Sequence, residues 1–107
     1  RNCLVGSEMC IRDRSIILDP GIGFGKTVKQ NLNLITNIAL LHSLGCPVLF
    51  GSSRKSFIGK LHKNALEEKR IGGSIATVIH ALNQGVQIFR VHDVFETSQA
   101  IKIYKKL

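Results

Sequence analysis

Residues 16–26 read IILDPGIGFGK, in which a short apolar run ends at an aspartate and a glycine-rich turn. An apolar run of this length, bounded by turn residues, is typical of a buried parallel strand. Two further runs follow the same pattern, PVLF at 47–50 before GSSRKS and VQIFRV at 86–91 before HD. A β/α barrel builds its active site from residues that follow parallel strands. The sequence therefore predicts an α/β fold with its functional groups at three strand ends.

Apolar residues at helical spacing separate the predicted strands. Segment 29–44 is expected to be one helix, because its apolar residues recur every three or four positions and Gly45 follows it. Segments 55–61 and 67–84 predict two helices before the third strand, and segment 95–107 predicts a closing helix. The predicted order is βαβαβα. The residues expected to point inward from these helices are Leu32, Ile35, Ala39, Leu40, Leu41, Leu44, Ile71, Ile75, Val78, Ile79, Leu82, Ala100, Ile101 and Tyr104.

The chain of 107 residues has only three predicted parallel strands, which leaves sheet edges and faces uncovered. We therefore expect it to be part of a larger domain. The first 14 residues, RNCLVGSEMCIRDR, have neither helical nor alternating periodicity. Within them, VGSEMCIRD looks like translated sequencing-adapter read-through. Residues 1–14 are therefore predicted to be non-native, and the natural sequence is expected to begin near Ser15 with its upstream part lost.

Composition argues against several classes of function. The net charge of +8 is spread along the chain without interleaved aromatic residues, which argues against a nucleic-acid partner. No apolar run approaches the roughly 18 residues of a membrane span, and no secretory signal pattern is seen. Cys3, Cys10 and Cys46 form neither an even set nor a C-x-x-C pair, so no disulfide framework or zinc site is predicted. We expect a cytoplasmic protein that does not bind a membrane.

The glycine-rich segment after the first strand matches neither common phosphate-binding motif. It reads GIGFGKT from Gly21, one residue short of the G-x-x-x-x-G-K-T phosphate loop and without the G-x-G-x-x-G spacing of dinucleotide-binding folds. Glycines do allow the backbone to approach a flat ligand closely, because they have no Cβ atom. Gly23 is therefore a candidate substrate-binding residue.

Three motifs carry a resemblance to a known family: IILDPGIGFGKT at 16–27, GSSRKSFIG at 51–59 and RVHDV at 90–94. In this order and spacing they resemble the dihydropteroate synthases, over about residues 16–107. The resemblance implies the C-terminal portion, strands six to eight with their helices, of a TIM-type (β/α)8 barrel. Residues 15–107 would then be the C-terminal part of a pterin-binding β/α-barrel domain.

The resemblance implies a transferase of folate biosynthesis, which condenses a dihydropterin pyrophosphate with para-aminobenzoate to give dihydropteroate and pyrophosphate. It also implies Mg²⁺ as a cofactor, with its protein ligand on the first barrel strand, and a homodimer formed by the last two helices. Small residues that would let another helix approach are Gly72, Gly73, Ala76 and Ala81. The chain alone is expected to be inactive, since it would build only part of the pocket.

The first motif supplies two candidate substrate-binding side chains. Asp19 could accept two parallel N–H bonds from the amino-pyrimidine edge of a pterin, as carboxylates do in bidentate pairs. Asp-Pro-Gly is also common turn chemistry, so a turn cap is the alternative interpretation of Asp19. Phe24 is expected to flank the aminobenzoate ring, with a packing role as its alternative.

The second motif places Lys55 where a strand end meets a helix start. Its ammonium would donate to the pterin carbonyl and add positive charge near the reacting centre. Ser56, with the free N–H groups of the helix, would take the aminobenzoate carboxylate. Arg54 is expected to point away into a structural ion pair.

The third motif places Arg90 and His92 on the same side of the last strand, because they alternate around Val91. The guanidinium would stack on the pterin and hold pyrophosphate, and the imidazole would donate to the same anion. Asp93 would either orient His92 or cap the last helix. The histidines expected to be surface or packing residues are His42, His62 and His80.

Lys55, Arg90 and His92 form the predicted catalytic set, since cations best stabilise the charge of a departing pyrophosphate. No covalent nucleophile is required, and no metal ligand is predicted in this chain. Two alternatives stay open. One is a related pterin-binding methyltransferase barrel that serves corrinoid proteins, and the other is a non-catalytic basic fragment that binds phosphate or nucleic acid.

Overall fold

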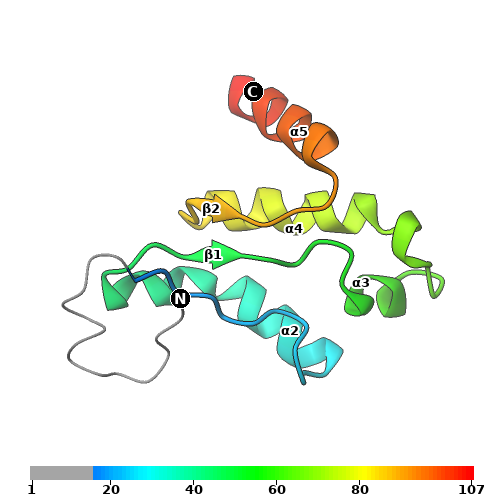
Figure 1. Cartoon of the computed structure of the whole chain (residues 1–107), viewed down its shortest axis with the longest axis horizontal. Helices are drawn as coiled ribbons and strands as arrows, with labels where there is room; N and C mark the ends of the chain where they lie inside the picture. Colours follow the sequence, from blue (N-terminus) through cyan, green and yellow to red (C-terminus); the bar gives the residue numbers. More distant parts are fainter. Residues whose placement is uncertain (1–15) are drawn as a thin grey trace.

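The computed structural model describes residues 16–107, whose elements are arranged as in Figure 1. Strands β1 (Leu49–Phe50) and β2 (Ile88–Phe89) pair in parallel. Leu18 forms a parallel bridge to Val48, on the opposite edge of the β1 segment. Three extended segments therefore lie side by side in chain order, as the sequence predicts.

Helical segments follow each of these extended segments. They are α2 (Val28–Thr36), the 3-10 helix η1 (Ile38–Leu44), α3 (Ser56–Leu61), the 3-10 helix η2 (Glu67–Lys69), α4 (Ile71–Asn83) and α5 (Val94–Lys106). Helix α4 contacts both α2 and α5, so it lies between them in space. The alternating order of extended and helical segments is confirmed. Within residues 16–107, no helix has the length and apolar character needed to cross a membrane.

The hydrophobic core lies between the extended segments and the helices. Val48 and Phe50 are buried in one cluster with Ile38 of η1 and Ala81 of α4. Successive side chains of a strand point to opposite faces. Leu49 accordingly faces away from this cluster and lines a cavity on the other side. One face of this strand therefore packs in the core, and the other faces the candidate site.

The single helix predicted at 29–44 is wrong, because the segment divides into α2 and η1. Asn37 ends the α-helix: its side-chain Nδ2 donates to the carbonyl of Asn33 at 3.0 Å, and its backbone turns to φ −107° and ψ 21°. The 3-10 segment that follows has three residues per turn, which changes the residues that face the core. Leu40, predicted to point inward, is 72% exposed, whereas Ile38 is fully buried.

The single helix predicted at 67–84 also divides, into η2 and α4. Arg70 lies at the break, and its guanidinium donates to the carbonyl oxygens of Ala65 and Arg54, both at 2.9 Å. The buried residues of α4 are Ser74, Val78 and Ala81. Of the residues predicted to point inward from this helix, Val78 is buried, and Ile71, Ile75, Ile79 and Leu82 are half-buried. A serine with a satisfied hydroxyl cannot be recognised as buried from hydrophobicity.

Two of the four small residues of α4, Gly73 and Ala81, serve packing inside the chain. A Cβ atom on Gly73 would collide with the side chain of Ile58, so the glycine lets α3 approach α4. Ala81 belongs to the core. Gly72 and Ala76 are the two that stay exposed. The closing helix agrees with its prediction to within a residue, but Tyr104 is 39% exposed rather than directed inward.

Candidate functional site

A cavity of about 180 Å³ lies where the three extended segments end. Its lining residues are Asp19, Phe24, Leu49, Gly51, Ser53, Lys55, Arg90 and His92. All three segments contribute, because residues that follow parallel strands meet at one edge of the sheet. Five of the seven predicted substrate-binding residues are thus brought together, and the remaining two, Gly23 and Ser56, lie outside the lining.

Asp19 both caps its turn and lines the cavity. Its Oδ1 accepts a hydrogen bond from the N–H of Gly21 at 2.9 Å, which confirms the turn interpretation. Gly21 has φ +72°, a conformation that glycine adopts without strain. The carboxylate has a second oxygen, to which nothing in residues 16–107 donates. Capping the turn therefore leaves Asp19 able to accept a hydrogen bond from a ligand.

Gly23 lies against Lys55, which lines the cavity, and is not itself a lining residue. It has φ +88°, and its N–H donates to Oδ1 of Asn31 at 2.8 Å. A Cβ atom at Gly23 would lie 2.8 Å from Cδ of Lys55. Asn31 is only 2% exposed on α2 and was not predicted from the sequence. The only feature of the sequence that could have indicated this role is that Asn31 is a polar residue on an otherwise apolar face of the helix.

Lys55 and Phe24 meet at the mouth of the cavity. The Lys55 ammonium lies 3.9 Å from the centroid of the Phe24 ring, a cation–π contact that brings the second motif against the first. Phe24 is 66% exposed, so its ring is open to a ligand and is not a core plug. Ser56 begins α3 next to Lys55, with its side chain in solvent.

Arg90 and His92 both line the cavity, whereas Val91 between them faces a different hollow. The predicted alternation is therefore confirmed. His92 is held by Ser53: the Ser53 hydroxyl lies 3.1 Å from the backbone N of His92 and 3.0 Å from its Nδ1. Ser53 is 5% exposed and was not predicted to have a role.

Arg54 and Asp93 form a two-bond ion pair across the same loops. Arg54 Nη2 lies 2.7 Å from Oδ1 of Asp93, and Nε lies 3.2 Å from Oδ2. The hydrogen bond from Arg54 lowers the pKa of Asp93 below its ordinary value, and the same bond raises the pKa of Arg54. The predicted structural ion pair of Arg54 is confirmed. Both roles predicted for Asp93 are wrong, because its carboxylate bonds Arg54 and makes no side-chain cap on α5.

The other histidines stay away from the cavity. His42 Nε2 lies 2.7 Å from the carbonyl oxygen of Gln84, a packing contact between η1 and the end of α4. His62 and His80 are exposed. The prediction that these three are packing or surface residues is confirmed.

The described part of the chain does not present a metal site. Among residues 16–107, no three His, Cys, Asp or Glu side chains lie close enough together to hold a metal ion. The Mg²⁺ that the sequence resemblance implies, with its protein ligand on the first barrel strand, stays a prediction.

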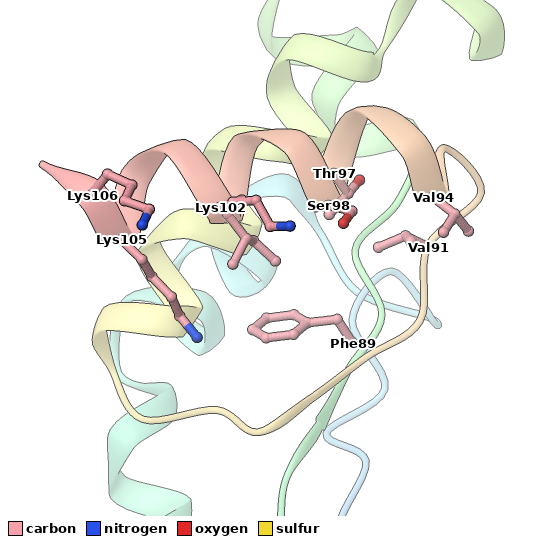
Figure 2. A pocket seen from close by; sticks show the side chains of 9 residues that line it. Phe89, Val91, Val94, Thr97, Ser98, Lys102, Lys105 and Lys106 are labelled. Carbon is pink, nitrogen blue, oxygen red and sulfur yellow. The ribbon is translucent and has the colours of Figure 1, made fainter.

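A larger and more apolar hollow of about 560 Å³ lies between β2 and α5. Figure 2 shows Phe89 across from α5, with Val91 and Val94 near the beginning of the helix and Lys102, Lys105 and Lys106 toward its end. Among the described residues that line it, the lysines of α5 carry the only charges, and there is no acid or imidazole that could move a proton. An uncovered apolar surface beside a parallel strand is what further β/α units would bury.

Comparison with known proteins identifies the family of this chain. Residues 5–92 match the family described as pterin binding enzyme. The chain belongs to this family. Its sequence is 46% identical over 105 residues to dihydropteroate synthase of Clostridium beijerinckii, an alignment that covers 96% of this chain and 39% of that protein. The chain spans 30% to 39% of the length of the curated relatives it matches.

Solved structures of pterin-binding enzymes superpose on most of the chain. Dihydropteroate synthase from Xanthomonas albilineans in complex with 7,8-dihydropteroate matches with a TM-score of 0.83 and 41% identity, covering 87% of this chain and 36% of that one. The enzyme from Thermus thermophilus in complex with 4-aminobenzoate matches with a TM-score of 0.81 and 40% identity, covering 86% and 38%. The fold is therefore part of a TIM-type barrel. The numbering of its strands as six to eight stays a prediction.

The family match begins at residue 5, inside the segment predicted to be non-native. Residues 1–14 lie outside the described part of the chain, and their origin stays a prediction. The cavity of about 180 Å³ is smaller than the roughly 300–1,000 Å³ of most ligand sites. A chain that spans only about a third of its relatives' length is expected to build one wall of such a site.

Proposed function

We propose that the full-length protein containing this chain is a dihydropteroate synthase, a transferase of folate biosynthesis. It would condense a dihydropterin pyrophosphate with para-aminobenzoate to give dihydropteroate and pyrophosphate. One observation carries the proposal. Three strand ends surround a single cavity with an acid, an aromatic ring and three basic side chains, in a chain that resembles synthases solved with 7,8-dihydropteroate and with 4-aminobenzoate.

Asp19 and Lys55 are proposed to hold the pterin. A carboxylate accepts from the two parallel N–H groups of an amino-pyrimidine, and an ammonium donates to the ring carbonyl. The ammonium already lies over Phe24, so the exposed ring would lie beside the reacting centre and flank the aminobenzoate. Gly23 supports this arrangement, since its lack of a Cβ atom leaves room for Lys55. Ser56 would hold the aminobenzoate carboxylate through its exposed hydroxyl.

Arg90 and His92 are proposed to stabilise the leaving group. Departure of pyrophosphate leaves an electron-deficient methylene on the pterin, which the aminobenzoate amine attacks. Donors aimed at a developing negative charge stabilise the transition state more than the ground state. Arg90 and His92 line the cavity together with Lys55, so three donors face one volume. A covalent intermediate with the protein is not required.

The proposal includes a homodimer, a cytoplasmic location and Mg²⁺ bound outside the described residues. The exposed Gly72 and Ala76 of α4 leave room for a second helix. The chain of 107 residues alone is expected to give no turnover, because an incomplete pocket admits water and positions substrates loosely.

The test uses the full-length protein and measures pyrophosphate release with both substrates and Mg²⁺. Lys55→Ala should lower kcat/KM by about 10²–10³, the usual cost of removing one donor from a preorganised site. Lys60→Ala is the matched control, because Lys60 is an exposed lysine on α3, the helix that begins directly after Lys55. Equal losses in both variants would refute the assigned active face.

The same protein distinguishes the alternatives. Turnover of a methylated folate in place of aminobenzoate would identify a methyltransferase of the corrinoid-serving type. Binding that ignores pterin and weakens steeply with salt would identify a phosphate- or nucleic-acid-binding protein. Either outcome would replace the synthase assignment.

A further inference from the structure

The hydroxyl of Ser53 contacts two nitrogen atoms of His92, and only one of them is necessarily a hydrogen-bond donor. A serine hydroxyl has one hydrogen to donate and can accept two hydrogen bonds. The backbone N–H of His92 donates to Ser53 Oγ at 3.1 Å, which uses one acceptor position. Across residues 16–107, the other partner of this hydroxyl is Nδ1 of the same histidine at 3.0 Å.

Burial decides the direction of the second bond. Ser53 is 5% exposed, so an unpaired hydroxyl hydrogen would be costly there. If Nδ1 carried a proton and donated to Ser53, the oxygen would accept twice and its own hydrogen would have no acceptor among the described residues. If Ser53 donates to Nδ1, the backbone N–H of His92, the Ser53 hydroxyl and the ring Nδ1 each have a hydrogen-bond partner. A neutral imidazole that accepts at Nδ1 carries its proton on Nε2.

We propose that Ser53 is a positioning residue that holds neutral His92 as the Nε2–H tautomer, so that the ring presents a hydrogen-bond donor to an anionic leaving group. His92 lines the cavity, and no residue of the described part bonds its Nε2. The double contact from Ser53 fixes the backbone and the ring of His92 together. The role of the donor rests on the proposed function, whereas the tautomer itself does not.

Nitrogen NMR of the full-length protein tests the tautomer without any substrate. With nitrogen-15-labelled histidine under mildly alkaline conditions, wild-type His92 should show a protonated Nε2 and an unprotonated Nδ1. Ser53→Ala should raise the share of the Nδ1–H form. Ser52→Ala is the matched control, because the Ser52 hydroxyl bonds Thr77 at 2.6 Å instead. A proton on Nδ1 in the wild type, or an unchanged spectrum in Ser53→Ala, would overturn the proposal.

Pyrophosphate release tests the consequence. Glutamine can place an amide N–H near the position of the histidine Nε2, whereas asparagine places one near Nδ1, so His92→Gln should retain more kcat than His92→Asn. Ser53→Ala should lower kcat by about tenfold, the value of one hydrogen bond. The same change in the His92→Gln background should cost little, because the tautomer no longer matters.

A purely structural role of Ser53 would give equal losses in both backgrounds, and that result would overturn the proposal. If the wild-type protein releases no pyrophosphate from the pterin substrate, the proposed function fails by itself. The NMR comparison of Ser53→Ala with Ser52→Ala then still decides whether Ser53 sets the tautomer of His92.

Discussion

Gly23→Ala should damage the site by displacing Lys55. The added Cβ atom would lie 2.8 Å from Cδ of Lys55. Nonbonded carbon atoms prefer at least about 3.5 Å, so Lys55 would have to move by about 0.7 Å. This shift would change the position of its ammonium relative to the Phe24 ring. Misplacement of a reacting group by about 1 Å can cost about 10²-fold in rate, so we expect kcat/KM to fall by about 10- to 100-fold.

Gly25→Ala is the matched control, because it also places an alanine at positive φ in the same loop but without the collision. Gly25 has φ +62°, and a Cβ atom there would meet nothing within 4 Å. A left-handed conformation costs a non-glycine residue about 1–2 kcal/mol, so both variants should unfold at lower urea concentration. The assay is pyrophosphate release by the full-length protein, with urea unfolding measured alongside. Equal kcat/KM in the two variants would show that contact with Lys55 has no part in the effect of Gly23.

Two further predictions concern stability of the full-length protein. Asn31→Leu removes the acceptor of the Gly23 N–H, so it should cost about 1–3 kcal/mol in urea unfolding, and an unchanged midpoint would contradict the bond. The hydrogen bond from Arg54 lowers the pKa of Asp93 in the folded state below its ordinary value of 3.8. The ion pair therefore stabilises the protein fully at pH values above 3.8, and this contribution is lost as the pH falls through the lowered pKa. The stability difference between wild type and Asp93→Asn should therefore shrink as acid is added below that pH, and a difference that stayed constant would contradict the ion pair.

Much of the candidate site is predictable from sequence because it depends on local patterns. A short apolar run followed by polar residues marks a parallel strand and the group at its end, which places Asp19 and Lys55 at one edge of the sheet. The period of two in a strand puts Arg90 and His92 on one side and Val91 on the other. These relations hold whatever the rest of the chain does.

The helix breaks at Asn37 and Arg70 were not predicted, because the spacing of apolar residues carries no information about side chains that donate hydrogen bonds to backbone carbonyls. At Asn37 the side-chain amide donates to the carbonyl of Asn33, four residues earlier in α2. At Arg70 the guanidinium reaches a carbonyl as far back as Arg54. Hydrophobicity alone therefore predicts longer helices than the structure contains.

Strand ends, their charged residues and the alternation of Arg90 with His92 were determined by the sequence alone, since each follows from the geometry of a few consecutive residues. Only the tertiary structure decided that Asp93 bonds Arg54 and that Ser53 bonds His92, pairs that are 39 residues apart in the chain. A buried hydroxyl or a paired carboxylate has the same local sequence as an exposed one. Its partner depends on which strand end lies beside it, and parallel strands bring together residues separated by an entire β/α unit.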